Sequence, residues 1–325
     1  MTAVEPPQTL YNQPATHFAM PLYLRSDTEV EPQVILELAE FFLSNLLFPS
    51  TRLTALHTKR PGDSARLNMG EFTRVRWDAA RKKILRGEYA VVEIRGEITD
   101  FPRQKIWFSL HVNPPGGGER LVAGTIEVQC SVSYLRHLSA SPERVEALLN
   151  LAKLAWSRVH GGPAYGYGHL AITLTRPAFD PRAPSAHGTP MPWDYVKPPE
   201  QRAHAVPIAF VGNDIEGNLA SLYCGNRGIK GAYWANFLSE AHIDLAGGES
   251  TLKSRLSGMR VEPLEHGGLL VVATEAPLPE DGEDTRERFL RLDEALRPAF
   301  LSRDETPEMK RGMLGYFYRE RPRLR

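Results

Sequence analysis

Residues 231–248 read GAYWANFLSEAHIDLAGG, and they decide how the second half of the chain is interpreted. The aromatic and apolar side chains between Ala232 and Ala241 predict a short helix with an aromatic face. Gly247-Gly248 predicts the end of that helix, because glycine adopts the backbone conformations that terminate helices. A second helix is expected directly afterwards, at 249–256. Nothing in the stretch has the spacing of catalytic side chains.

The segment 259–274 predicts a hairpin. Its centre is His266-Gly267-Gly268, between two apolar runs, and glycine supplies the positive φ that tight turns require. The same three residues occur in esterase oxyanion holes, but the chain has no Gly-x-Ser-x-Gly nucleophile motif. We therefore interpret them as a turn.

Helical periodicity is also clear elsewhere. Pro32 and Pro142 suit the first turn of a helix, where their missing N–H would have no partner. Apolar residues at helical spacing follow each proline and predict one amphipathic helix after each. The expected helices lie at 31–47, 141–160, 232–256 and 285–301. The expected strands lie at 88–98, 105–113, 121–134, 169–175, 206–211, 218–223 and 313–318.

These elements predict an α+β fold, with antiparallel sheet covered by amphipathic helices. Each half combines β-rich segments with an amphipathic helix, so a pseudo-duplicated architecture of two units is compatible with the sequence. The expected organisation is an extended N-terminal arm at 1–21, an α+β unit at 22–176, a proline-rich connection at 177–205 and a second α+β unit at 206–325.

Composition indicates a globular protein. The 325 residues are 42% hydrophobic and 24% charged, and 39 basic side chains balance 39 acidic ones. Because there is no basic excess, binding to long nucleic acid is not expected. No membrane-spanning apolar run or signal peptide is recognised, so a cytoplasmic location without membrane contact is expected. Cys130 and Cys224 are interpreted as buried, reduced thiols.

Motifs for chemistry are missing from the sequence. It has no Cys-x-x-Cys, no His-Glu-x-x-His and no phosphate-binding glycine motif, so no metal or cofactor is expected. Tyr165-Gly166-Tyr167-Gly168 is interpreted as an aromatic loop that packs on the body or contacts a partner. The basic residues within 74–83 and at the C-terminus are interpreted as solvated surface.

The densest acidic stretch contains Glu280, Asp281, Glu283 and Asp284, in a loop before the helix expected at 285. Three interpretations remain open. The stretch is a solvated loop whose charges favour the start of the helix, a surface that meets a basic partner, or a metal site. Adjacent carboxylates on a loop are poorly preorganised for metal binding, which makes the third interpretation the weakest.

The second half resembles bacterial type VI secretion immunity proteins of the TsiV kind, which counteract VRR-type nuclease effectors. The resemblance covers 205–301 and is carried by five features in this order: Tyr233-Trp234-Ala235-Asn236-Phe237-Leu238, Leu245-Ala246-Gly247-Gly248, the His266-Gly267-Gly268 hairpin, Ala276-Pro277, and Leu296-Arg297-Pro298-Ala299-Phe300. It implies a protein without catalytic residues that neutralises a cognate secreted toxin, a nuclease, by direct protein–protein binding.

The resemblance supplies no contact residues, so the candidates come from exposed aromatic and acidic chemistry. They are Tyr165, Tyr167, Trp193, Tyr195, Glu280, Asp281, Glu283 and Asp284. The protein is expected to be a monomer or homodimer whose partner is the toxin. Two alternatives remain: an enzyme whose site is assembled from distant residues, and an adaptor or scaffold subunit of a bacterial assembly.

Overall fold

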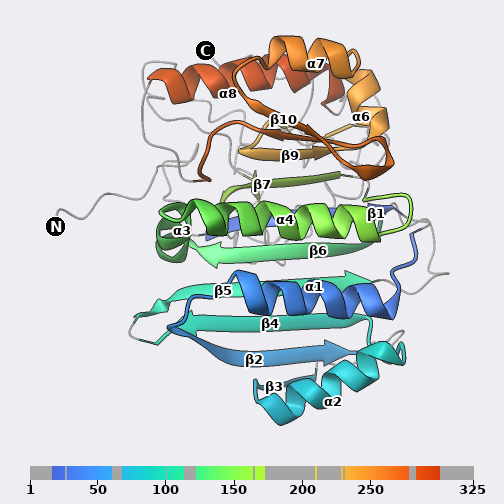
Figure 1. Cartoon of the computed structure of the whole chain (residues 1–325), viewed down its shortest axis with the longest axis vertical. Coiled ribbons are helices and arrows are strands. Elements are labelled where there is room, and N and C mark those ends of the chain that lie inside the picture. Colours follow the sequence, from blue (N-terminus) through green and yellow to red (C-terminus); the bar gives the residue numbers. More distant parts are fainter. Residues whose placement is uncertain are drawn as a thin grey trace, which may run out of the picture.

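One 11-stranded sheet runs through the part of the chain that the structure, a computed structural model, describes (Figure 1). The described residues are 17–25, 28–60, 68–99, 101–112, 122–163, 165–172, 209–210, 228–229, 231–277 and 283–300. The strands are β1 (His17–Arg25), β2 (Thr51–Lys59), β3 (Asn68–Glu71), β4 (Val91–Ile98), β5 (Phe101–Val112), β6 (Val122–Ser131), β7 (Tyr165–Ile172), β8 (Ala209–Phe210), β9 (Ala235–Leu238), β10 (Arg260–Pro263) and β11 (Leu269–Val272).

The strand order is β10-β11-β9-β7-β1-β6-β5-β4-β2-β3, and β8 pairs with β7 beside this path. The pairing of β7 with β8 is parallel, and the other strand pairs are antiparallel. The sheet continues across the expected boundary between the two units, because β9 pairs with β7. The internal duplication stays a prediction.

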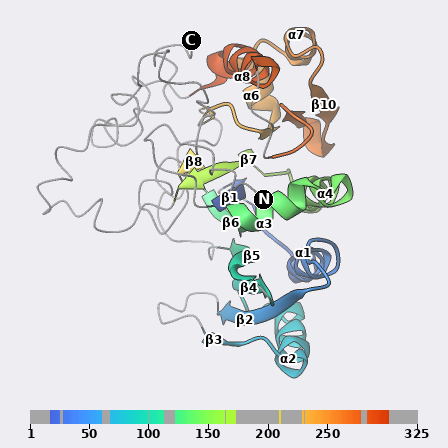
Figure 2. The same cartoon turned by 90° about the vertical axis from the view of Figure 1, so that its left-hand side faces the viewer.

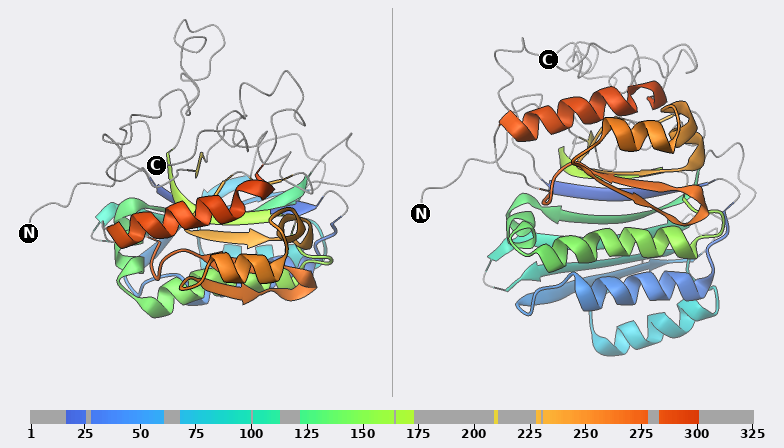
Figure 3. Two further views of the ribbon diagram at one scale, coloured as in Figure 1. Left: turned by 90° about the horizontal axis from the view of Figure 1, so that it is seen from above. Right: turned by 45° about the horizontal axis from the view of Figure 1, so that its top comes forward.

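Helices α1, α2 and α4 lie side by side on one face of the sheet (Figure 2), and α7 and α8 lie at its end beside β9, β10 and β11 (Figure 3). The helices are α1 (Pro32–Asn45), α2 (Arg74–Leu85), α3 (Val132–Ser139), α4 (Pro142–Arg158), α6 (Glu240–Leu245), α7 (Glu249–Arg255) and α8 (Glu283–Leu296), with 3-10 turns η3 (Glu265–Gly267) and η4 (Arg297–Ala299). This arrangement confirms the α+β prediction. None of the helices in the described ranges is long and apolar enough to cross a membrane.

The long helices expected at 31–47, 141–160 and 285–301 are present as α1, α4 and α8. The apolar stripes of α1 and α4 face the sheet. Phe42 of α1 is buried and stacks on Phe108 of β5, with ring centroids 5.4 Å apart. Trp156 of α4 is buried and stacks on Phe237 of β9 at 6.4 Å. Cys130 of β6 is buried, and burial raises the pKa of its thiol. Cys224 lies outside the described residues.

Strand β1 lies in the middle of the sheet and contains residues 17–21, which were expected to belong to the arm. Pro21 argues against a central strand, because proline cannot donate to a ladder. The pairing of β1 with β7 is interrupted between Ala19 and Leu22, at the proline, while the pairing with β6 continues through it. The missing N–H is therefore accommodated on one side of the strand.

The helix predicted at 232–241 is wrong except at its last two residues, because residues 235–238 form β9 and α6 begins only at Glu240. Every residue from 231 to 239 is buried, and β9 pairs with β11 on one edge and with β7 on the other. A short apolar run that is buried all round has no periodicity that distinguishes strand from helix. Ser239 then starts α6, and its hydroxyl lies 3.0 Å from Nδ1 of His242.

The double-glycine stop is confirmed. The N–H of Gly248 donates to the carbonyl of Ile243 at 2.9 Å, and that of Gly247 donates to the carbonyl of Asp244 at 3.0 Å. Both glycines have positive φ, so the end of α6 is a Schellman motif. Helix α7 follows, as predicted for 249–256.

The hairpin predicted at 259–274 is also confirmed, with β10 and β11 joined through η3. His266 and Gly267 both have positive φ at the turn. Of the other predicted strands, 218–223 and 313–318 lie outside the described residues, and only 209–210 of 206–211 are described, as β8. The basic residues of 74–83 belong to α2.

Candidate partner-binding surface

The β10–β11 hairpin is attached to α4 by the indole ring of Trp156. Its Nε1 donates to the carbonyl of Glu265 at 2.9 Å. Gly268 allows this close approach, because a Cβ at that position would lie 2.7 Å from Nε1 and 2.8 Å from two carbons of the ring. Gly268 has φ of −78°, so the space and not the backbone conformation requires glycine here.

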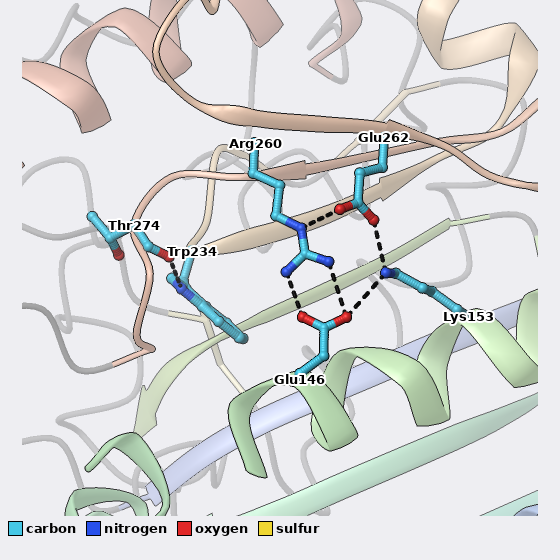
Figure 4. Close-up of polar contacts among 6 residues, drawn as sticks. All are labelled: Glu146, Lys153, Trp234, Arg260, Glu262 and Thr274. Atoms are coloured by element: carbon cyan, nitrogen blue, oxygen red, sulfur yellow. Dashed lines mark hydrogen bonds and ion pairs between the residues drawn. The ribbon is translucent and has the colours of Figure 1, made fainter. Parts of the chain in front are cut away.

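A network of four charged side chains joins the same two elements (Figure 4). Arg260 of β10 donates to both carboxylate oxygens of Glu146 of α4, at 2.6 and 3.0 Å, and also to Glu262. Lys153 Nζ lies 2.7 Å from Oε2 of Glu262 and 3.3 Å from Oε1 of Glu146. The hydrogen bond from Arg260 lowers the pKa of Glu146 to about 2. The network fixes the hairpin against the first half of the chain.

A groove of about 820 Å³ lies between α6, α7 and the end of α8. It is lined by Leu245, Arg255, Arg291, Glu294, Ala295, Arg297 and Pro298. Leu245 is 39% exposed, which is unusual for a large apolar side chain in this structure. The groove therefore combines an apolar contact with several guanidinium groups.

Contacts between α7, α8 and the turn after α7 position these arginines. Arg288 donates to the carbonyl of Gly258 at 3.0 Å and to Asp284 at 2.9 Å. Asp293 is buried and pairs with Arg297. Arg255 ends α7 and Arg291 projects from α8; both are exposed and neither has a carboxylate partner in the described ranges.

Two of the four acidic candidates lie within the residues that the structure describes. Glu283 and Asp284 are exposed and lie in the first turn of α8, which begins two residues earlier than predicted. Carboxylates at this position interact favourably with the positive end of the helix dipole. Glu280 and Asp281 lie outside the described residues, as do the aromatic candidates Trp193 and Tyr195. The charge therefore changes from negative at the start of α8 to positive at the groove.

Tyr165 and Tyr167 require a correction, because they lie in β7 and not in a loop. Both side chains are 0% exposed. Tyr167 stacks on Tyr233 at 4.5 Å, and its hydroxyl lies 3.3 Å from that of Tyr23. Burial raises the pKa of Tyr167 well above its usual value. These rings belong to the core, and a partner cannot contact them in this conformation.

A cluster that the sequence did not predict lies on the sheet face opposite α1. Glu93 of β4 lies 3.2 Å from both His57 Nδ1 and His111 Nε2, and 3.3 Å from Arg95. The hydrogen bond to His111 is the main reason that the pKa of Glu93 falls to about 2. A carboxylate held ionised in this way is a poor proton donor. Cross-strand pairing accounts for the cluster, because His57 lies opposite Glu93 and His111 lies two positions along β5 from Ser109, the other residue opposite Glu93.

Side chains that could ligate a metal do not gather in groups of three or more among the described residues. The arginines of the groove and the network on α4 were not identified from the sequence either. In the sequence, every member of these two groups is an isolated charged residue on an amphipathic or hairpin segment, and such residues are usually solvated. Only the packing of α7 on α8, and of β10 on α4, brings them together.

Comparison with known proteins gives a match to one family model. Residues 185–316 match the family described as TsiV, type VI immunity for VRR-NUC. The match includes the hairpin, the groove and α8, and it confirms the resemblance of the second half. A Pseudomonas aeruginosa T6SS protein, PA0821, is similar in structure, with a TM-score of 0.53 and 15% identity over 87% of this chain and 73% of that chain. At this identity the similarity shows the fold alone. Comparison with curated proteins gave no match.

Proposed function

We propose that this protein is a cytoplasmic immunity protein that neutralises a cognate type VI toxin, a nuclease, by binding it directly. The observation that carries the proposal is the match of residues 185–316 to the TsiV family of type VI immunity proteins. Such a protein acts by occupying a surface of the toxin and needs no catalytic residues of its own.

The geometry of the second half supports this function. Its surface carries both signs of charge along α8, with Glu283 and Asp284 at one end and the arginines of the groove at the other. Complementary charge accelerates capture of a partner and rejects incorrect ones. The acidic end suits a basic surface, which a DNA-cleaving enzyme needs for its substrate. We assign Glu283 and Asp284 to the interface on this basis.

The supporting elements also suit a binding role. The helices that carry the charged surface are attached to a sheet whose strands come from both halves of the chain. The Trp156 contact and the Glu146–Arg260 pair hold the adjacent hairpin to α4. A rigid surface loses little conformational entropy on binding, and this favours tight association.

The test uses the product of the adjacent gene as the toxin. Co-expression should restore growth to cells that die when they produce this toxin alone, and the two purified proteins should elute together in size-exclusion chromatography. A catalytically inactive toxin should bind equally well, because the proposal requires no turnover. If the two proteins neither associate nor protect cells, the proposal is wrong.

The enzymatic alternative has its own measurement. An enzyme would remove the toxicity at substoichiometric amounts, whereas a binding protein protects only at about one molecule per toxin. Titration of nuclease activity with increasing immunity protein separates the two, and a sharp end point at equal concentrations supports binding.

A further inference from the structure

The groove between α6, α7 and α8 presents positive charge that the described part of the chain does not neutralise. Arg255 and Arg291 are exposed, and neither forms an ion pair there. By contrast, the neighbouring Arg297 is paired with Asp293 and Arg288 with Asp284. Two guanidinium groups from different helices thus line one groove without an ion pair to any residue that the structure describes.

The form of the groove suits a peptide segment. A planar guanidinium binds a carboxylate through two parallel hydrogen bonds, which gives orientation as well as attraction. Leu245 supplies an apolar contact in the same groove and is 39% exposed. The volume of about 820 Å³ is large enough for several side chains.

Charge in the surroundings favours an acidic peptide over nucleic acid. Glu294 lines the groove itself, and Glu283, Asp284 and Glu287 are exposed on the same helix. These carboxylates would repel a continuous phosphate backbone, and the whole chain has no net positive charge. A short segment with one or two carboxylates can bind the arginines without meeting Glu283, Asp284 and Glu287 at the start of α8, and within the groove it meets only the carboxylate of Glu294.

We propose that this groove binds an acidic segment of the toxin, with carboxylates on Arg255 and Arg291 and an apolar side chain against Leu245. The inference rests on the proposed function and adds the chemistry of the partner's contact. The groove and the acidic start of α8 would then contact opposite charges on the toxin. The toxin would place basic groups against Glu283 and Asp284 and acidic groups in the groove.

The experiment measures the affinity of purified, catalytically inactive adjacent-gene product for three forms of this protein. They are the wild type, the double variant Arg255→Glu/Arg291→Glu, and the control Arg74→Glu/Lys82→Glu. The control makes the same change in net charge on exposed side chains of α2, at the opposite end of the sheet (Figure 1). Circular dichroism and thermal unfolding establish that each variant is folded.

We expect the groove variant to raise Kd by at least about tenfold, because arginines buried on binding are common hot spots, and the control to stay within about twofold. Salt should weaken the wild-type complex more steeply than the complex of the groove variant. Reversal of one acidic residue of the toxin to Lys should restore binding to the groove variant.

The outcomes separate the two proposals. If the wild type does not bind the adjacent-gene product, the proposed function fails. If the wild type binds and the folded groove variant binds equally tightly, only the assignment of the groove is wrong. A fluorescent DNA duplex provides a further arm: loss of duplex binding in the groove variant, with unchanged toxin affinity, would overturn the acidic-segment proposal in favour of a phosphate ligand.

Discussion

Replacement of Gly268 by Ala should loosen the hairpin from α4. The added Cβ would lie 2.7 Å from Trp156 Nε1 and 2.8 Å from two ring carbons, closer than real Cβ atoms approach. The indole is buried and its Nε1 is bonded to Glu265, so the ring has little freedom to move. Overpacking of this kind costs about 1–3 kcal/mol of unfolding free energy. For a chain of this size the melting temperature should fall by about 1–5 °C.

The assay is urea unfolding monitored by circular dichroism, on Gly268→Ala, Trp156→Phe and the double variant. Trp156→Phe alone should destabilise the protein, because it removes packing and one hydrogen bond. In the Gly268→Ala background the smaller ring should cost less, because it relieves the clash. The two changes should therefore be non-additive by roughly 0.5–2 kcal/mol.

A suitable control is Gly231→Ala, whose Cβ would meet the nearest atom, the hydroxyl of Tyr233, at an ordinary 3.5 Å. This variant should remain within about 1 kcal/mol of the wild type. Equal stability of Gly268→Ala and the wild type would refute the reasoning, and so would strict additivity with Trp156→Phe, because either result means that the ring and the hairpin do not constrain each other.

Two further predictions concern carboxylates whose pKa is lowered to about 2 from an ordinary 4.5. Glu146→Gln should lower the unfolding free energy by about 0.5–1 kcal/mol at neutral pH, since the pair with Arg260 is partly exposed. Because folding lowers this pKa, the difference in unfolding free energy between Glu146→Gln and the wild type should be complete above pH 4.5 and disappear as the pH falls to about 2. A constant difference across this pH range, measured by urea unfolding, would contradict the assignment. Glu93→Gln should cost more, about 1–3 kcal/mol, because its partners His57 and His111 lose a charged acceptor in a half-buried site. The destabilisation by Glu93→Gln should also decrease between pH 4.5 and about 2. Thermal unfolding of this variant and of the wild type should therefore show a smaller difference at pH 3 than at pH 7.

The elements that could be predicted from the sequence have an amphipathic pattern and a recognisable end. Helix α1 has Pro32 in its first turn and one apolar stripe, and α6 stops at Gly247-Gly248, so local physics determines both boundaries. The hairpin is similar, because Gly267 takes the positive φ that its turn requires. In each case the local signal agrees with the tertiary structure.

The elements that could not be predicted depend on neighbours that are distant in sequence. Strand β9 reads as a helix because all four of its residues are buried, which removes the alternation of a strand, and its pairing with β7 and β11 cannot be seen in the sequence. Tyr165 and Tyr167 read as a loop because Gly166 interrupts them, yet the glycine is needed where its Cβ would lie 2.2 Å from Leu22. Strand β1 was not predicted because it contains Pro21, which cannot donate a backbone hydrogen bond. Only strand pairing supplies these constraints.

The candidate surface has the same limitation. Arg255 and Arg291 are ordinary exposed residues on separate helices, and nothing in the sequence connects them. They converge because α8 is held to the turn after α7 by Arg288 and Gly258. Acidic residues were easier to find, because Glu283 and Asp284 are adjacent in the sequence.

The insertion of β9 beside β7 restricts how a chain of this kind can diversify. A gene fragment that ended before residue 231 would leave the backbone of β7 from Tyr165 to Gly168 without the partner strand that covers it. Open strand edges promote aggregation, so a truncated chain, or an exchanged second half whose strand does not pair with β7, would risk being insoluble. Point changes on α6, α7 and α8 leave the strands intact, and under the proposed function they offer selection a safer route to new toxin specificities.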